Sequence, residues 1–292
     1  MQQLVLGTVQ LGLPYGVTNE SGQPSSAEAE SILSTFTAHV GSWFDTAPSY
    51  GTSEDLLGKF IGHQNESHIC TKSISFDLTQ RLTGQISDLE QSFQRSLMRL
   101  GRKRVEIFLM HQADCLNHPD FPRVKEWLLE QKQRGAIAAL GVSIYDRRDV
   151  HQWESHLDWI DWVQMPLNIL DQRVVNDGFI QYLRRHNIQL QARSVFLQGL
   201  LLSSKRRRSG YSVCALESLA RVHRFYDENE INPLKACLDY VQQQDVDQVL
   251  VGANSNEELM AIINAWSKGS SALDYTSLVS SDNYLIHPPA WS

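Results

Sequence analysis

The chain contains the stretch SWFDTAPSYGTSEDLLGKFI at residues 42–61, which joins a short apolar run to a periodic apolar pattern through a polar turn. Residues 42–46 are predicted to form a β-strand, because a short apolar run is typical of a strand buried on both faces. Residues 53–61 follow a glycine and place Leu56, Leu57 and Phe60 on one face of an expected helix. The stretch therefore predicts one strand–loop–helix unit, with Asp45 near the end of its strand.

Seven further units of this kind complete the chain. With the first unit included, the eight expected strands cover residues 4–7, 42–46, 68–72, 105–110, 138–142, 161–165, 188–193 and 248–252. The expected helices cover residues 26–40, 53–61, 82–100, 121–134, 146–153, 178–186, 232–244 and 256–266. Strands that alternate with helices form βαβ units and a parallel sheet.

Eight units favour a closed barrel over an open sheet. An open sheet that binds a dinucleotide usually carries G-x-G-x-x-G after its first strand, whereas residues 7–12 here are GTVQLG. No linker, repeat or low-complexity segment divides the chain. A barrel of eight units needs about 250 residues. We therefore expect an α/β fold, a (β/α)8 TIM-type barrel, as one domain over residues 1–292.

The composition limits the classes of binding partner and the cellular compartment that we expect for this protein. The sequence has 292 residues, with 26 Lys and Arg against 33 Asp and Glu, which gives a net charge of −7. Nucleic-acid surfaces usually need clustered basic charge, so no nucleic-acid partner is expected. No apolar stretch reaches about 18 residues and no secretory signal is visible, so we expect a cytoplasmic protein without a membrane partner. The four cysteines form no C-x-x-C pair, and we expect no metal site.

Polar residues with reactive side chains end three successive expected strands. Asp45 and Lys72 lie at two strand ends, His111 follows the next strand, and Tyr50 lies in the loop after Asp45. In a barrel of this kind, the active site forms at the carboxyl ends of the strands. A lysine ammonium favours the phenolate form of a nearby tyrosine, and an aspartate can hold that lysine in place. The set suits proton donation to a carbonyl oxygen, with His111 bonded to the same oxygen or sharing the proton.

The pattern resembles that of the aldo/keto reductase family. Residues 44–58, FDTAPSYGTSEDLLG, are similar to the family signature of an Asp, a Tyr five residues later, Gly-x-Ser-Glu and Leu-Gly. TK at residues 71–72 and MHQ at residues 110–112 are similar to the lysine and histidine strands of the family. Further likenesses are LGTVQLG at 6–12, LGVS at 140–143, WVQMPLN at 162–168, GLL at 199–201 and VGANSNEEL at 251–259.

The resemblance implies reduction of an aldehyde or ketone, including sugar-like carbonyl compounds, by NADPH or NADH. Asp45, Tyr50, Lys72 and His111 would be the catalytic residues, with Tyr50 as the general acid. The implied cofactor-binding residues are Gly7, Thr8, Asp45, Ser143, Gln164, Arg193, Ser194, Gly199, Gly252, Asn254 and Glu258. Among these, Ser143 and Gln164 would bind the nicotinamide carboxamide. The first strand starts almost at Met1, so most of the N-terminal hairpin of the family is expected to be missing.

The chain departs from the family pattern at three places. Arg193 stands where many members have an aromatic residue that stacks on the nicotinamide, and Ile144 stands where an Asn is common. Arg193 can also stack, but its positive charge should repel the oxidised nicotinamide more than the reduced ring. Glu258 replaces a cation that often binds the 2′-phosphate, and a carboxylate suits a free ribose better. The choice between NADPH and NADH therefore stays open at this point.

Alternatives remain open for the function and for two segments. Barrels of this type also act as binding or regulatory subunits with weak or no turnover. A metal enzyme that uses Asp45 and His111 lacks a supporting ligand cluster. The basic run at residues 205–208 is either a solvated loop or a phosphate clamp. The segment from residue 282 either contributes to the substrate pocket or packs elsewhere on the barrel.

Overall fold

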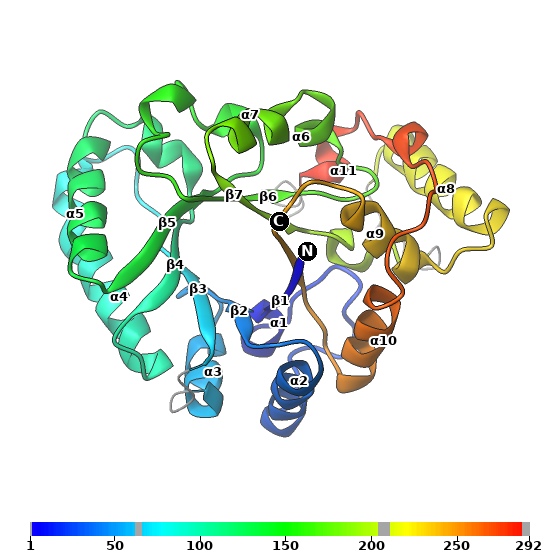
Figure 1. Ribbon diagram of the computed structural model, residues 1–292, viewed down its shortest axis with the longest axis horizontal. Helices are drawn as coiled ribbons and strands as arrows, with labels where there is room; N and C mark the ends of the chain where they lie inside the picture. Colours follow the sequence, from blue (N-terminus) through cyan, green and yellow to red (C-terminus); the bar gives the residue numbers. More distant parts are fainter. Residues whose placement is uncertain (1, 62–65, 204–210, 288–292) are drawn as a thin grey trace.

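Eight parallel strands form a closed barrel in the protein, for which we describe a computed structural model of residues 2–61, 66–203 and 211–287. The strands pair in sequence order around the ring (Figure 1), and β8 closes the barrel by pairing with β1. They are β1 Gln3–Gly7, β2 Trp43–Asp45, β3 His68–Lys72, β4 Val105–Met110, β5 Ile137–Ser143, β6 Trp162–Pro166, β7 Gln189–Arg193 and β8 Gln248–Val251. The predicted barrel is confirmed, and every predicted strand end lies within one residue of the observed end.

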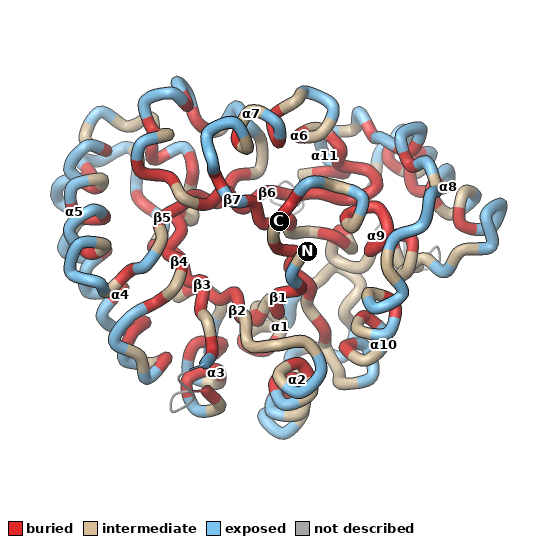
Figure 2. The backbone as a smooth tube through the Cα atoms, viewed as in Figure 1, coloured by how far each residue is buried: buried red, intermediate tan, exposed pale blue. Residues whose placement is uncertain are grey.

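Helices surround the barrel and bury their inner faces against it. They are α1 Val9–Gly12, α2 Ser26–His39, α3 Ser53–Ile61, α4 Ile86–Leu100, α5 Phe121–Gln133, α6 Arg173–Asn176, α7 Phe179–Arg185, α8 Val213–Glu228, α9 Pro233–Gln242, α10 Asn256–Trp266 and α11 Asn283–Ile286. Figure 2 shows buried strands in the ring and exposed outer faces on the helices. No helix within the described residues is long and apolar enough to cross a membrane. No hairpin precedes β1 in the described chain.

The helix expected at residues 146–153 was predicted wrongly. This segment forms two short 3-10 turns, Arg147–Asp149 and Trp153–Ser155. Asp146 and Asp149 cap the first turn reciprocally, and Gln152 adopts a φ of 49°. A left-handed residue interrupts the helical path, so the periodic pattern cannot continue through it.

The sequence analysis missed the helix α8. The Ser212 side chain accepts a hydrogen bond from the Ala215 backbone N–H and so caps the first turn. Leu219, Val222 and Tyr226 are buried at a spacing of three or four residues. The sequence therefore carried a usable signal, an N-cap serine followed by a periodic apolar face. The basic run at residues 205–208, just before it, lies outside the described residues.

A buried glutamate at the start of α3 fixes the strand that carries Lys72. The Thr71 hydroxyl donates to Glu54 Oε1 over 3.0 Å, and the Ser96 hydroxyl donates to Glu54 Oε2 over 3.1 Å. Glu54 is 1% exposed, and burial raises the pKa of its carboxyl against the opposing effect of these hydrogen bonds. One side chain therefore ties α3 to both β3 and α4.

The loop that carries Tyr50 packs directly on the backbone of α1. A Cβ atom added to Gly12 would lie 1.8 Å from the Tyr50 carbonyl oxygen and 2.6 Å from the Ser53 nitrogen. Gly51 adopts a φ of 57°, and its added Cβ would lie 2.2 Å from the Gly12 carbonyl oxygen. Only glycine allows two backbones to approach so closely. The two glycines thus fix the height of Tyr50 above the barrel.

We predict that Gly12→Ala destabilises the fold, because the added methyl group collides with backbone that cannot move independently of Tyr50. The free energy of unfolding should fall by about 2 kcal/mol, a cost typical of overpacking. Gly84→Ala is the matched control, since an added Cβ there meets nothing within 4 Å. Urea unfolding of both variants tests the prediction, and equal midpoints for the two would contradict it.

Candidate active site

The four predicted catalytic residues lie together at the carboxyl end of the barrel. Asp45 is the last residue of β2, Lys72 is the last residue of β3, and His111 follows β4 directly. Tyr50 lies in the loop between β2 and α3, where two turn hydrogen bonds of its backbone, with Ala47 and Ser53, hold it. These three strands are neighbours in the barrel (Figure 1), so residues far apart in sequence meet at one rim.

Asp45 and Lys72 form a buried ion pair. Lys72 Nζ lies 2.7 Å from Asp45 Oδ1 and 2.8 Å from Oδ2, and it also donates to the Thr46 carbonyl oxygen over 3.0 Å. The two residues are 1% and 3% exposed. Burial lowers the pKa of Lys72, but the charge of Asp45 and the interaction with Tyr50 outweigh it, so the net pKa is raised. The lysine therefore stays charged inside the protein.

The Lys72 ammonium lies beneath the ring of Tyr50. Its Nζ is 5.0 Å from the ring centroid. Burial raises the pKa of Tyr50, whereas the charge and hydrogen bond of Lys72 and the charge of Arg193 lower it, and the net pKa lies above the usual value of 10.0. The effect of Lys72 has the direction expected from the sequence, although burial outweighs it. The phenol is therefore protonated at neutral pH and ready to donate.

His111 stands beside Tyr50 as a neutral imidazole. The two rings meet edge to face with centroids 6.0 Å apart. Its backbone N–H donates to the Ser73 hydroxyl over 3.0 Å, which fixes the residue at the end of β4. Burial, together with the positive charges of Lys72 and Arg193, lowers the pKa of His111 to about 3. A neutral imidazole can donate one hydrogen bond to a substrate oxygen but lacks the acidic second proton of an imidazolium.

A cleft of about 390 Å³ runs from these residues across the barrel mouth to α10. All the predicted site residues except Lys72 line it, and Lys72 lies buried beneath Tyr50. The lining residues that the sequence predicted are Gly7, Thr8, Asp45, Tyr50, His111, Ser143, Gln164, Arg193, Ser194, Gly199, Gly252, Asn254 and Glu258. The elongated shape suits a long ligand whose two ends meet different groups.

At the catalytic end, Gln164 connects the cleft to Asp45. Its Nε2 donates to Asp45 Oδ2 over 2.8 Å, and its Oε1 accepts from the Ser143 hydroxyl over 3.2 Å. Gln164 is 1% exposed and Ser143 is 5% exposed. The ion pair of Asp45 is thus completed by an amide that also borders the cleft. Ile144, the second departure from the family pattern, is fully buried beside them.

Arg193 stacks on an aromatic residue that the sequence analysis did not select. Its guanidinium lies 4.1 Å from the ring centroid of Tyr145, and its Nη2 donates to the Ile144 carbonyl oxygen over 2.8 Å. No ion pair of Arg193 occurs within the described residues. Tyr145 also contacts the ring of His287, with centroids 4.9 Å apart. The C-terminal segment therefore reaches the rim of the cleft through His287, whereas residues 288–292 lie outside the described chain.

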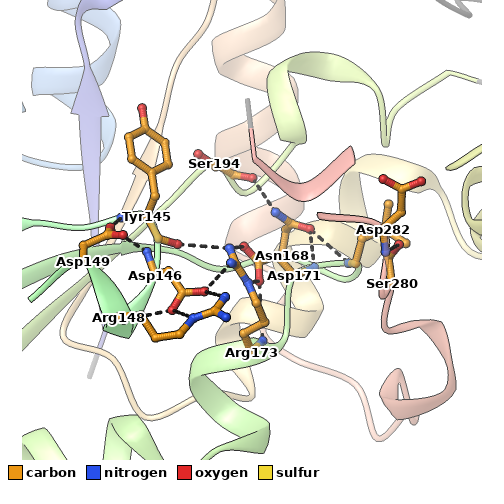
Figure 3. A network of polar contacts seen from close by, with 11 residues as sticks. Tyr145, Asp146, Arg148, Asp149, Asn168, Asp171, Arg173, Ser194, Ser280 and Asp282 are labelled. Carbon is orange, nitrogen blue, oxygen red and sulfur yellow. Dashed lines mark hydrogen bonds and ion pairs between the residues drawn. The ribbon is translucent and has the colours of Figure 1, made fainter. Parts of the chain in front are cut away.

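Figure 3 shows the polar network that holds the loops on this side of the cleft. Arg173 pairs with Asp146 over 2.7 Å and with Asp171 over 2.8 Å, which joins the loop after β5 to the loop after β6. Asn168 Nδ2 donates to the carbonyl oxygen of Ser194 over 3.1 Å. Ser194 has a φ of 60°, a strained conformation for a residue other than glycine. The network thus holds the strained turn that follows Arg193.

Glu258 is tied back to its own loop at the far end of the cleft. Its Oε2 accepts from the Asn254 backbone N–H over 2.8 Å and from Asn254 Nδ2 over 3.3 Å. The apolar residues Ala261 and Ile262 line the same end. This end of the cleft therefore presents one carboxylate beside an apolar wall.

The sequence analysis missed the segment after β1, which crosses the cleft. Thr18 donates to the Gln198 carbonyl oxygen over 3.2 Å, and Asn19 Nδ2 donates to Asn254 Oδ1 over 3.2 Å. Gln10 also lines the cleft, and its buried Oε1 has no hydrogen-bond partner among the described residues. A buried acceptor without a partner is costly, and a hydroxyl of a bound ligand would satisfy it. The glycine-rich turns at both sides were the only sequence signal for this crossing.

The barrel and its cleft define an α/β-barrel protein with a buried ion pair beneath a tyrosine and a histidine. Comparison with known proteins gives a family: the chain belongs to the aldo/keto reductase family, whose model matches residues 3–282. D-arabinose 1-dehydrogenase of Saccharomyces cerevisiae is 24% identical over 277 residues, covering 88% of this chain and 80% of the relative. L-glyceraldehyde 3-phosphate reductase of Escherichia coli O157:H7 is 24% identical over 314 residues, covering 91% and 87%.

A solved structure agrees with the fold. The holo form of an aldo-keto reductase from Bacillus halodurans superimposes with a TM-score of 0.73 at 20% sequence identity. The match covers 96% of this chain and 94% of the other. At this identity the likeness establishes the barrel architecture and leaves the chemistry to the residues of the site.

We predict that His111 stays neutral between about pH 5 and about pH 8, the range in which an unperturbed histidine titrates. A pKa of about 3, below the usual 6.5, means that the proton is lost well below this range. The imidazole nitrogen shifts of His111, measured by NMR and assigned with the variant His111→Asn, should not change across it. A titration of these shifts with a midpoint near pH 6 would contradict the burial argument.

Proposed function

We propose that the protein reduces an aldehyde or ketone by hydride transfer from NADPH or NADH, with Tyr50 as the general acid. The observation that carries the proposal is the geometry of three side chains. Lys72 is charged and held by Asp45, and its Nζ lies 5.0 Å from the ring centroid of Tyr50. The ring centroid of neutral His111 lies 6.0 Å from that of Tyr50, on the same rim. This arrangement suits donation of a phenolic proton to an oxygen that gains negative charge.

The cleft fits an extended nicotinamide nucleotide. It supplies acceptors at the catalytic end, an unpartnered Gln10 oxygen between the ends, and a carboxylate with an apolar wall at α10. The bound nucleotide would supply the hydride. Ser143 and Gln164 would hold its carboxamide, Gly7 and Thr8 would border the adjacent ribose, and Glu258 would meet the adenosine end.

The residues of the chain supply the proton, orient the substrate and stabilise the charges that form. Tyr50 donates its proton to the carbonyl oxygen, and the Lys72 ammonium stabilises the phenolate that remains. His111 donates a hydrogen bond to the same oxygen and orients the carbonyl compound. Arg193 adds a positive charge at this end, which favours binding of the uncharged reduced ring over the oxidised cation and therefore aids release of the oxidised cofactor after hydride transfer. Asp45 keeps Lys72 charged and in place.

The substrate that we infer is a sugar-like aldehyde. By their names, the two curated relatives act on D-arabinose and L-glyceraldehyde 3-phosphate, which are a sugar and a triose phosphate. The polar groups beside Tyr50, including Tyr15, Tyr145 and Arg193, offer hydrogen bonds to several hydroxyls. A panel of aldehydes that differ in the number of hydroxyl groups tests this assignment, and equal efficiency for all of them would reject it.

We predict that Tyr50→Phe lowers the turnover of carbonyl reduction by roughly 10²-fold or more, because the variant loses the proton donor of the chemical step. The dissociation constant of the cofactor, measured by tryptophan fluorescence, should stay within about twofold. Lys72→Met should damage turnover to a similar degree. Tyr182→Phe is the control, since Tyr182 bonds Glu154 away from the cleft.

Two outcomes would contradict this mechanism. Wild-type turnover in the folded Tyr50→Phe protein would identify another group as the acid. Absence of reduction by the wild-type protein across the aldehyde panel, together with tight cofactor binding, would instead favour a binding protein without turnover.

We predict that Glu258→Arg shifts the preference toward the 2′-phosphorylated cofactor by roughly five- to tenfold, because the change replaces a repelling charge at an exposed position with an attracting one. The measurement is the ratio of dissociation constants for NADH and NADPH. Glu257→Arg changes the net charge equally, but Glu257 does not line the cleft. An unchanged ratio in Glu258→Arg would show that this carboxylate does not face the ribose.

A further inference from the structure

A row of polar side chains follows one level of the barrel wall over five adjacent strands. Ser143, Gln164, Gln191, Gln248 and Gln3 are successive register partners on β5, β6, β7, β8 and β1. The three central glutamines are 1%, 0% and 3% exposed. We call this row the polar belt. The apolar cluster of Cys70, Ile107, Leu109 and Trp162 fills another part of the barrel interior, and Cys70 Sγ donates to Gln191 Oε1 over 3.9 Å.

The hydrogen bonds of the polar belt all run in one direction. The Ser143 hydroxyl donates to Gln164 Oε1 over 3.2 Å. Gln164 Nε2 then donates to Gln191 Oε1 over 3.0 Å, and Gln191 Nε2 donates to Gln248 Oε1 over 2.6 Å. Gln248 Nε2 finally donates to Gln3 Oε1 over 3.3 Å. Each amide therefore fixes which edge its neighbour must present.

Asp45 sets the direction of the polar belt. An ionised carboxylate only accepts hydrogen bonds, so Gln164 must turn its NH₂ edge toward Asp45 Oδ2, which lies 2.8 Å from Nε2. The second N–H of the same group then goes to Gln191. Both amide hydrogens of Gln164 are therefore engaged in hydrogen bonds, and its oxygen points toward Ser143.

The direction decides what the cleft offers to a ligand. Gln164 Oε1 uses one lone pair on Ser143, and the Ser143 hydroxyl has given its hydrogen to Gln164. The free positions of both groups are therefore acceptors, and they border the catalytic end of the cleft. A ligand group that donates two N–H bonds fits there, whereas one that can only accept does not.

We propose that Gln191, which does not line the cleft, is a positioning residue that keeps the oxygen of Gln164 turned toward the cofactor and thereby selects the NH₂ group of the nicotinamide carboxamide. The inference rests on the proposed function. Gln191 acts by accepting the second N–H of Gln164 from the side away from the cleft. Gln248 acts behind it by accepting from Gln191. Without Gln191, one amide hydrogen of Gln164 loses its partner, and Asp45 alone holds the NH₂ edge, so the amide plane can tilt and move its oxygen away from the cleft.

The test compares a nicotinamide cofactor with its 3-acetylpyridine analogue, in which a methyl ketone replaces the carboxamide. The analogue keeps the carbonyl oxygen but cannot donate an N–H bond. Wild-type protein should bind the reduced nicotinamide cofactor roughly tenfold more tightly than the reduced analogue. Gln191→Met should reduce this preference to within about twofold. Both dissociation constants are measured by tryptophan fluorescence, without turnover.

Two variants separate positioning from general destabilisation. Gln191→Glu places a carboxyl near Asp45 in the barrel interior, where burial and the like charge favour its neutral form. A neutral carboxyl accepts from Gln164 and donates to Gln248, so the wild-type preference should return. Ile107→Val loosens the apolar cluster and removes no hydrogen-bonding group of the polar belt. It should weaken binding of both nucleotides equally, if at all, and keep the preference.

The outcomes are distinct. Failure of the wild-type protein to bind any nicotinamide nucleotide defeats the proposed function itself. Binding of the nicotinamide cofactor and the analogue with equal affinity, or a wild-type preference in folded Gln191→Met, overturns the role of Gln191 while the proposed function stands. If Gln191→Met does not fold, Gln248→Met replaces it, because it removes the acceptor that orients Gln191. A wild-type preference in that variant overturns the inference equally.

Discussion

The ion pair between Asp45 and Lys72 is the interaction on which the site depends. Both charges are almost fully removed from water, and an unpaired charge there would cost several kcal/mol. Three interactions compensate for this burial: the ion pair itself, the bond from Lys72 to the Thr46 carbonyl, and the bond from the Gln164 amide to Asp45. Asp45 and Lys72 lie on the neighbouring strands β2 and β3, whereas Gln164 comes from β6. The complete set of contacts therefore forms only when these strands come together in the barrel.

The same pair organises the charges around it. A permanent ammonium beneath Tyr50 opposes the rise in the phenol pKa that burial causes. With Arg193 it also adds to the effect of burial, which lowers the pKa of His111 and keeps it neutral. Asp45 also fixes the direction of the hydrogen bonds along the barrel wall, because it accepts one from Gln164. Part of the interior is consequently polar and ordered by hydrogen bonds, while another part is filled by apolar side chains. A uniformly apolar interior would pack as well but could not orient an amide at the cleft.

Features that depend on interactions between residues close in sequence were easier to predict than features that depend on contacts between distant residues. Strands were placed within one residue, because burial on both faces leaves a local apolar run. The segment 146–153 failed because a left-handed Gln152 and a reciprocal Asp146–Asp149 cap override its helical periodicity. The helix α8 had a local signal, an N-cap serine and an apolar face, that was not used. The crossing of the segment after β1 over the cleft had almost none, since its partners Gln198 and Asn254 are distant in sequence.

The sequence by itself determined the eight strands, the family resemblance and the order of Asp45, Tyr50, Lys72 and His111 along the chain. These features depend on residue type and spacing, which are local properties. Only the tertiary structure decided the net pKa directions, the stacking of Arg193 on Tyr145, and the alignment of Gln164, Gln191 and Gln248 at one level. Burial and hydrogen-bond direction depend on which strands become neighbours and in which register. That register is fixed when the barrel closes, and no single segment contains it.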